Sequence, residues 1–178
     1  GQIIIGRSLG SGGVRRPGTG QLWFPAESKA VYVFDAEKIG ADGGRLNPTF
    51  LGMIQTGHTS ASLRGDPIIT ASDGEIPSYL ILSIADGLET MKLQAYPLSP
   101  PEAAPAVQGN LPAPIELAGW AWFPPHCDSE KLAVVTDRGE FGLFGIRQTG
   151  NLDVPIFVLP PEPYVLPDTR IASRGQVI

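Results

Sequence analysis

Residues 79–96 read YLILSIADGLETMKLQAY, and this stretch decides the fold class. Two apolar runs, Tyr79–Ile84 and Met91–Tyr96, flank an Asp-Gly pair at positions 86 and 87. Runs rich in β-branched and aromatic residues on either side of such a pair are typical of a β-hairpin with a tight turn. The sequence therefore predicts two antiparallel strands joined by a short turn.

Similar runs continue on both sides of this hairpin, separated by residues that favour turns. Together they predict an all-β chain with four antiparallel strands in each of three segments. The expected strands of the first segment are Ile3–Ile5, Leu22–Phe24, Ala30–Phe34 and Phe50–Ile54. Those of the second are Ile68–Ala71, Tyr79–Ile84, Met91–Tyr96 and Ile115–Ala118. Those of the third are Trp120–Phe123, Leu132–Thr136, Phe141–Ile146 and Ile156–Leu159.

A glycine that leads into an apolar run gives these segments a common phase. It occurs as Gly1, Gly65, Gly119 and Gly175. This phase predicts a single domain over residues 1–178, with repeats at about 1–64, 65–118 and 119–174, and a further strand beginning at 175–178.

A second register competes with the glycine phase. Asp35, Asp86 and Asp137 follow apolar runs at equal intervals, and Trp-Phe-Pro occurs at both 23–25 and 122–124. We prefer the glycine phase because it leaves no residues at the amino end without a place in a repeat. Either register gives about three repeats.

Four-stranded antiparallel repeats of this size are typical of β-propeller blades. The segments AVYVFDA at 30–36 and KLAVVTDRGEF at 131–141 resemble the strand, Asp, Gly and strand pattern of bacterial quinoprotein-like (PQQ-like) and WD40-like propellers. The resemblance covers nearly the whole chain and implies a partial propeller of about three blades, taken from a larger multidomain protein. The regularly placed tryptophan motif of quinone-dependent dehydrogenases is missing, so we expect no bound quinone.

Composition and charge narrow the function class. The chain has 22 glycines, 18 prolines and only 17% charged residues, which argues against a helical bundle. Its formal net charge is −5 and its Lys and Arg residues are scattered, so no nucleic-acid-binding stripe is expected. No run approaches the about 18 apolar residues of a spanning helix, so we expect no membrane insertion.

Few residues suggest chemistry. His126, Cys127 and Asp128 are adjacent potential metal ligands, but neighbours on an extended segment point to opposite sides. A closed zinc site needs four ligands, and a Cys–His pair for catalysis is assembled across a fold. The aspartates at 35, 86 and 137 are expected to form turns. We therefore predict no catalytic residues, no metal site and no cofactor.

One loop is the candidate for contact with a partner. Residues 9–20 are rich in glycine and contain Arg15 and Arg16, and we expect them to form an exposed loop. Long loops on rigid scaffolds often carry binding residues. The Arg64-Gly65-Asp66 triplet matches an adhesion signal, but its glycine already belongs to the repeat phase.

These observations predict a non-catalytic propeller scaffold that binds a protein or peptide. The alternative is a fragment of a quinoprotein-type or hydrolytic propeller enzyme whose active site lies outside this segment. Three blades do not close a ring, because known propellers have about four to eight. We therefore expect the two end faces to be covered, either by further blades of a longer chain or by a second copy in a homodimer.

Overall fold

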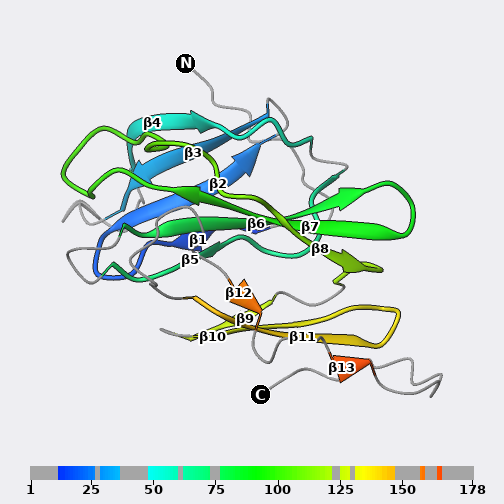
Figure 1. Ribbon diagram of the computed structural model, residues 1–178. Helices are drawn as coiled ribbons and strands as arrows, with labels where there is room; N and C mark the ends of the chain where they lie inside the picture. The colour runs from blue at the N-terminus through cyan, green and yellow to red at the C-terminus, as the bar shows by residue number, and fades with distance from the viewer. Residues whose placement is uncertain are drawn as a thin grey trace, which may run out of the picture.

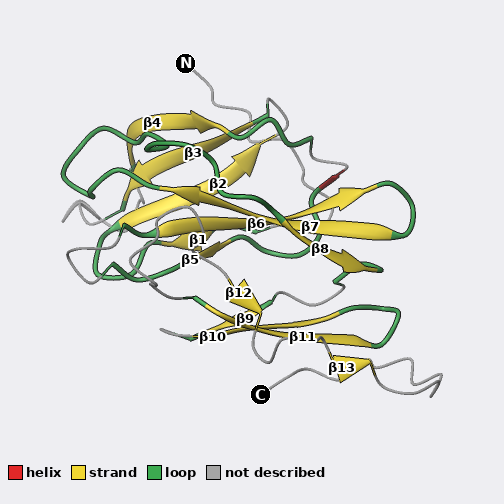
Figure 2. Cartoon of the chain, in the orientation of Figure 1, coloured by secondary structure: helices red, strands yellow, loops and turns green. Residues whose placement is uncertain are grey.

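The computed structural model describes residues 12–26, 29–36, 48–59, 62–72, 77–121, 125–128 and 131–146, together with two short strands at 157–158 and 164–165. Strands and loops make up almost everything described, with hardly any helix (Figure 2). The strands form three antiparallel sheets that lie one above another in Figure 1. The expectation of an all-β, antiparallel chain is confirmed.

Each sheet is built from one continuous part of the chain, and its strands follow in sequence order. Sheet 1 contains β1 (Val14–Arg15), β2 (Gln21–Ala26), β3 (Ala30–Asp35) and β4 (Thr49–Gln55). Sheet 2 contains β5 (Ile68–Ile69), β6 (Tyr79–Asp86), β7 (Thr90–Pro97) and β8 (Ile115–Ala118). Sheet 3 contains β9 (His126–Cys127), β10 (Lys131–Val135), β11 (Glu140–Gly145) and β12 (Phe157–Val158), and β13 (Tyr164–Val165) also pairs with β11.

Sheets 1 and 2 pack face to face through a buried apolar cluster. From sheet 1 the cluster takes alternate residues of the central strands, among them the fully buried Trp23 and Val33. From sheet 2 it takes Leu80, Leu82 and Tyr96. The Tyr96 hydroxyl donates a hydrogen bond of 2.9 Å to the carbonyl oxygen of Thr56, just after β4.

The opposite face of sheet 2 packs on sheet 3. Ile81 and Leu93 project to this side, because residues alternate across a strand, and they meet Leu132, Val134 and Phe144 of sheet 3. All five side chains are at most 2% exposed. Sheet 2 is therefore covered on both faces, and its central strands read as nearly continuous apolar runs for that reason.

The first strand of sheet 1 differs from the expected one. The structure places Val14–Arg15 beside β2, whereas the predicted strand Ile3–Ile5 lies outside the described residues. Val14 packs against the cluster between sheets 1 and 2. Gly13 lies directly against the ring of Phe24, where any side chain would collide. Partial burial of Val14 and the close approach of Gly13 to Phe24 hold this segment against sheet 1.

The prediction of an exposed loop at 9–20 is wrong in two respects, because Val14–Arg15 forms a strand and Arg16 is buried, while Arg15 is exposed as expected. Arg16 is only 2% exposed. Its guanidinium donates hydrogen bonds to the carbonyl oxygen of Ser99 at 2.8 Å and to Gln21 Oε1 and Ser78 Oγ, both at 3.4 Å. Gln21 Nε2 in turn donates to the carbonyl oxygen of Pro101 at 2.8 Å. Arg16 therefore connects sheet 1 to the ends of two strands of sheet 2.

The first strand of sheet 3 also differs from the prediction. It is β9, and not Trp120–Phe123, of which residues 122 and 123 lie outside the described part. Trp120 cannot pair as a strand because Asp137 occupies both of its backbone groups. The Trp120 amide donates to Asp137 Oδ1 at 2.7 Å, and the Asp137 amide donates to the Trp120 carbonyl oxygen at 2.9 Å.

The two described phase glycines occupy the same place in the fold. Gly65 and Gly119 each lie between the last strand of one sheet and the first strand of the next, with φ of 75° and 81°. The three aspartates of the competing register do not occupy equivalent places in their sheets. Asp86 and Asp137 lie at the hairpin between the second and third strands of their sheets, whereas Asp35 ends the third strand of sheet 1.

Candidate functional site

Four connections meet at one end of sheets 2 and 3, to the right in Figure 1. They contribute the five residues that we call the loop-end surface. Arg64 comes from the connection between β4 and β5, and Trp120 from that between β8 and β9. Glu89 lies in the β6–β7 hairpin, and Asp137 and Arg138 lie in the β10–β11 hairpin.

Arg64 and Trp120 form the aromatic part of the loop-end surface. The guanidinium carbon of Arg64 lies 4.2 Å from the centre of the Trp120 ring, which is a cation–π contact. The backbone positions Arg64, because its amide donates to the Ser83 carbonyl oxygen at 2.8 Å. Its Nη1 also donates to the carbonyl oxygen of Leu63 at 2.9 Å. Both residues are partly exposed, although Arg64 Nε and Trp120 Nε1 are buried and Trp120 also packs against the cluster between sheets 2 and 3.

Arg138 and Glu89 form the charged part. Arg138 Nη2 lies 3.0 Å from Glu89 Oε1, and the two side chains are 48% and 71% exposed. An ion pair this exposed contributes only about 0–1 kcal/mol to stability. A carboxylate of a binding partner can therefore replace Glu89 beside Arg138 at small cost.

Backbone contacts hold the loop-end surface together. The Gly119 amide donates to the Glu89 carbonyl oxygen at 2.6 Å, and the Ala118 amide donates to Glu140 Oε2 at 2.7 Å. Together with the two hydrogen bonds between Trp120 and Asp137, they join the hairpins of sheets 2 and 3. The connections at this end are thus fixed to their sheets, as a preorganised binding surface requires.

Gly119→Ala is expected to destabilise the protein by about 2–3 kcal/mol, against about 1 kcal/mol for Gly87→Ala. Both glycines have φ of +81°, so alanine is strained at each position. A Cβ at Gly119 would also collide with Asp137 Oδ1 and lie 2.9 Å from Arg138 Cγ, whereas Gly87 has nothing within 4 Å. Urea unfolding of both variants measures the difference. Equal losses would show that the connection does not approach the β10–β11 hairpin this closely.

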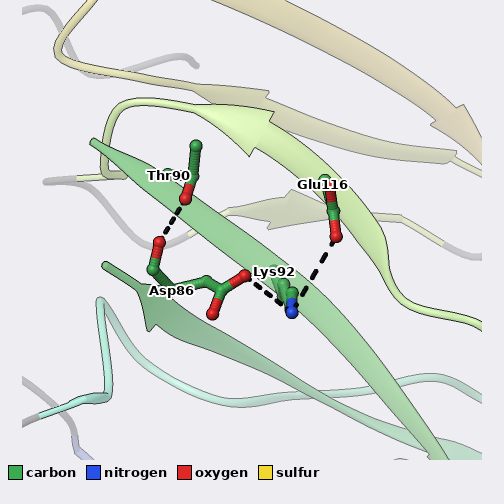
Figure 3. A network of polar contacts seen from close by, with 4 residues as sticks. All are labelled: Asp86, Thr90, Lys92 and Glu116. Atoms are coloured by element: carbon green, nitrogen blue, oxygen red, sulfur yellow. Dashed lines mark hydrogen bonds and ion pairs between the residues drawn. The ribbon is translucent and has the colours of Figure 1, made fainter. Parts of the chain in front are cut away.

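A second charged cluster lies at the same end of sheet 2 (Figure 3). Lys92 Nζ is 2.6 Å from Asp86 Oδ2 and 3.8 Å from Glu116 Oε1, and the Thr90 hydroxyl donates to the Asp86 carbonyl oxygen. The hydrogen bond that Lys92 donates to the Asp86 carboxylate raises the pKa of Lys92. Because each residue already has an internal partner, the cluster serves to pair three neighbouring strands.

Arg15 and Arg16, which the sequence predicts as contact residues, lie near the start of β2. This end of the sheets is opposite to the loop-end surface. Arg15 is exposed, and its Nε donates to the Thr19 carbonyl oxygen at 2.9 Å within the same turn. Arg16 is buried, and burial lowers the pKa of its guanidinium, while the charge of Glu102 acts in the opposite direction. Arg15 alone of the two is accessible to a partner.

The structure separates the residues considered for metal binding or nucleophilic chemistry. His126 is exposed, whereas burial, with the charge of Asp128, raises the pKa of the Cys127 thiol to about 11. His58 is 2% exposed, and its Nε2 donates to the Ala26 carbonyl oxygen at 3.1 Å. Its Nδ1 accepts from the Thr56 hydroxyl at 2.5 Å, and burial lowers its pKa. Both nitrogens of this imidazole are therefore engaged.

The aspartates at 35, 86 and 137 do not converge on a common point, because Asp35 lies at the far end of sheet 1. Within the described residues, no group of three or more His, Cys, Asp and Glu side chains is arranged to hold a metal ion. The described part of the chain contains no helix long and apolar enough to cross a membrane. No family model, curated protein or solved structure matches this sequence.

Proposed function

We propose that this chain is a non-catalytic scaffold of the β-propeller type that binds a protein or peptide through the loop-end surface. The observation that carries the proposal is the meeting of four connections from three sheets, which places two arginines and a tryptophan on one surface. Arg and Trp are enriched among the residues that dominate binding energy at protein interfaces.

The arrangement of the sheets supports the propeller-type scaffold. The first four strands of each sheet lie in sequence order, with β13 as an additional partner of β11 in sheet 3. Neighbouring sheets pack face to face, and the first strands of sheets 1 and 2, β1 and β5, lie near each other. In a propeller, the first strand of every blade lines the central axis and the connections gather at the two ends. The loop-end surface corresponds to one such end.

The chemistry of the surface indicates the kind of partner. Arg138 presents a guanidinium group that is 48% exposed, and Arg64 presents a second, partly exposed one beside Trp120. Guanidinium groups bind carboxylates through charge-assisted hydrogen bonds. Asp137 already accepts a hydrogen bond from the Trp120 amide, so its carboxylate is held by the fold. We therefore expect an acidic peptide segment, with an apolar residue beside Trp120.

The test is selection of peptides from a displayed random library on the purified chain, followed by affinity measurements on variants. Arg64→Ala and Arg138→Ala are each expected to weaken binding of a selected acidic peptide by at least about tenfold. Arg15→Ala is the matched control, since it removes an exposed arginine at the other end of sheet 1, and its affinity should equal that of the wild type. Loss of binding in Arg15→Ala alone would place the contact at the turn after β1 and overturn the proposal.

A further inference from the structure

Sheet 1 carries a continuous apolar surface on the side away from sheet 2. Directly opposed residues of three strands form it, in two rows that run across the sheet. Ring centres of neighbouring aromatic residues lie 5.6–6.0 Å apart. We call it the outer face of sheet 1, and its residues are Leu22, Phe34 and Phe50 in one row and Phe24, Tyr32 and Met53 in the other.

Part of this face is open to solvent. Phe50 is 47% exposed and Met53 is 48% exposed, which is unusual for large apolar side chains next to one another. In the part of the chain that the structure describes, no sheet packs on it.

The other two sheets show what covers the equivalent face. The residues in question lie two, four or six residues before the residue that closes the hairpin after the second strand, which is Ala26 in sheet 1, Asp86 in sheet 2 and Thr136 in sheet 3. In sheet 2 they include Leu80 and Leu82, which are buried against sheet 1. In sheet 3 they include Leu132 and Val134, which are buried against sheet 2. Each of these faces thus receives the preceding sheet of the stack.

The same count places the outer face of sheet 1 in this series. Leu22 and Phe24 lie four and two residues before Ala26, which closes the β2–β3 hairpin. The cross-strand pair Leu22–Phe34 is therefore the counterpart of Leu82–Gln94, on the face of sheet 2 where sheet 1 buries Leu80 and Leu82. In both interfaces within the chain, a sheet covers the next sheet with the face that points away from the sheet before it. We therefore expect the outer face of sheet 1 to be covered by a sheet that uses this same kind of face.

Sheet 3 offers such a side. Its strands β10 and β11 place Ala133 opposite Leu143 and Val135 opposite Phe141, on the face away from sheet 2. We name these four residues the outer face of sheet 3, and all are partly exposed. Its side chains are apolar, as are those that sheet 1 and sheet 2 present to their following sheets.

We propose that a second copy of this chain covers the outer face of sheet 1 with the outer face of its sheet 3. A two-fold axis repeats the contact, so that the dimer contains two equivalent interfaces and closes a ring of six sheets. This size lies within the about four to eight blades of known propellers. The inference rests on the propeller-type scaffold proposed above, but it does not depend on peptide binding.

The test is light scattering of the purified chain over a series of concentrations. The wild type is expected to be a dimer at low micromolar concentration. Met53→Glu should weaken dimerisation by at least about a hundredfold, because it buries an unpaired carboxylate at both interfaces. Leu88→Glu is the matched control, since Leu88 is 88% exposed in the β6–β7 hairpin, away from both outer faces, and it should leave the dimer intact.

Ala133→Glu distinguishes the proposed contact from a dimer in which sheet 1 meets sheet 1. It should also dissociate the dimer, provided that its thermal unfolding shows it to be folded. Hydrogen exchange on the wild type supplies a check without any variant, because dilution to monomer should speed exchange in both β4 and β10. A wild-type monomer, a dimer that Met53→Glu leaves intact, or changes in β4 without changes in β10 would overturn the proposal. Peptide binding by the monomeric Met53→Glu variant tests the loop-end surface separately.

Discussion

Leu80→Ala and Ile81→Ala are each expected to lower the free energy of unfolding by about 2–5 kcal/mol. The two residues are neighbours on β6, so their side chains point to opposite faces of sheet 2. Leu80 is 0% exposed between sheets 1 and 2, and Ile81 is 1% exposed between sheets 2 and 3. Each substitution removes buried methyl groups and leaves a cavity. Urea unfolding followed by tryptophan fluorescence measures both losses.

Leu88→Ala is the control for these two variants, because its side chain is almost fully exposed, and its stability should change by no more than about 0.5 kcal/mol. A large loss for Leu80→Ala together with a negligible loss for Ile81→Ala would contradict the structure. That result would mean that sheet 3 does not cover sheet 2. The comparison therefore tests the stacking of all three sheets.

Arg16→Ala should destabilise the protein by about 2 kcal/mol, whereas Arg15→Ala should change its stability by no more than about 0.5 kcal/mol. The Arg16 guanidinium is the donor to the buried Ser99 carbonyl oxygen and to Gln21 and Ser78. Its loss leaves those acceptors without this donor and removes the link between sheets 1 and 2. Arg15 bonds only within its own turn and stays exposed.

Chemical unfolding of the two arginine variants at neutral pH is the measurement. Equal effects, or a larger effect for Arg15→Ala, would mean that the turn after β1 is detached from sheet 2. The two arginine variants also distinguish an effect on stability from an effect on peptide binding. Arg16 is expected to act on stability, while Arg15 serves as the exposed control in the peptide experiments.

Long strands could be predicted from the sequence because their apolar runs and turns are local signals. The runs 79–84 and 91–96 form β6 and β7, and the run 132–136 forms most of β10. The Asp and Gly residues that follow the runs 79–84 and 132–136 also lie in the hairpins between the strands, as predicted. Such segments carry enough residues for the pattern to appear without knowledge of the neighbouring sheets.

The two-residue strands β5 and β12 lie within the predicted strands Ile68–Ala71 and Ile156–Leu159, whereas β1 and β9 were not predicted. Two residues are too few to show alternation, and neither β1 nor β9 lies within an apolar run. Val14–Arg15 forms a strand because β2 provides the hydrogen-bonding edge and sheet 2 buries Val14. β2 follows β1 closely along the chain, but the strands of sheet 2 lie far away in the sequence. The prediction followed glycine content instead and assigned an exposed loop.

The loop-end surface was missed for a related reason. Arg64 and Trp120 meet only because sheets 1, 2 and 3 stack, and the sequence between them gives no sign of the contact. One signal was available in the glycine phase. Arg64 precedes Gly65 and Trp120 follows Gly119, so both flank glycines that recur at the same place between sheets. Such recurring glycines place the residues next to them in equivalent connections between neighbouring sheets.

Hydrogen exchange in the presence and absence of a selected peptide locates the bound partner directly. If the loop-end surface is the binding site, exchange should slow at residues 63–66, 87–90, 118–121 and 136–140. These segments contain the backbone amides around Arg64, Glu89, Trp120 and Arg138. Exchange at residues 15–20, at the opposite end of sheet 1, should not change. Slowing confined to residues 15–20, with none in the four connections, would contradict the proposed function.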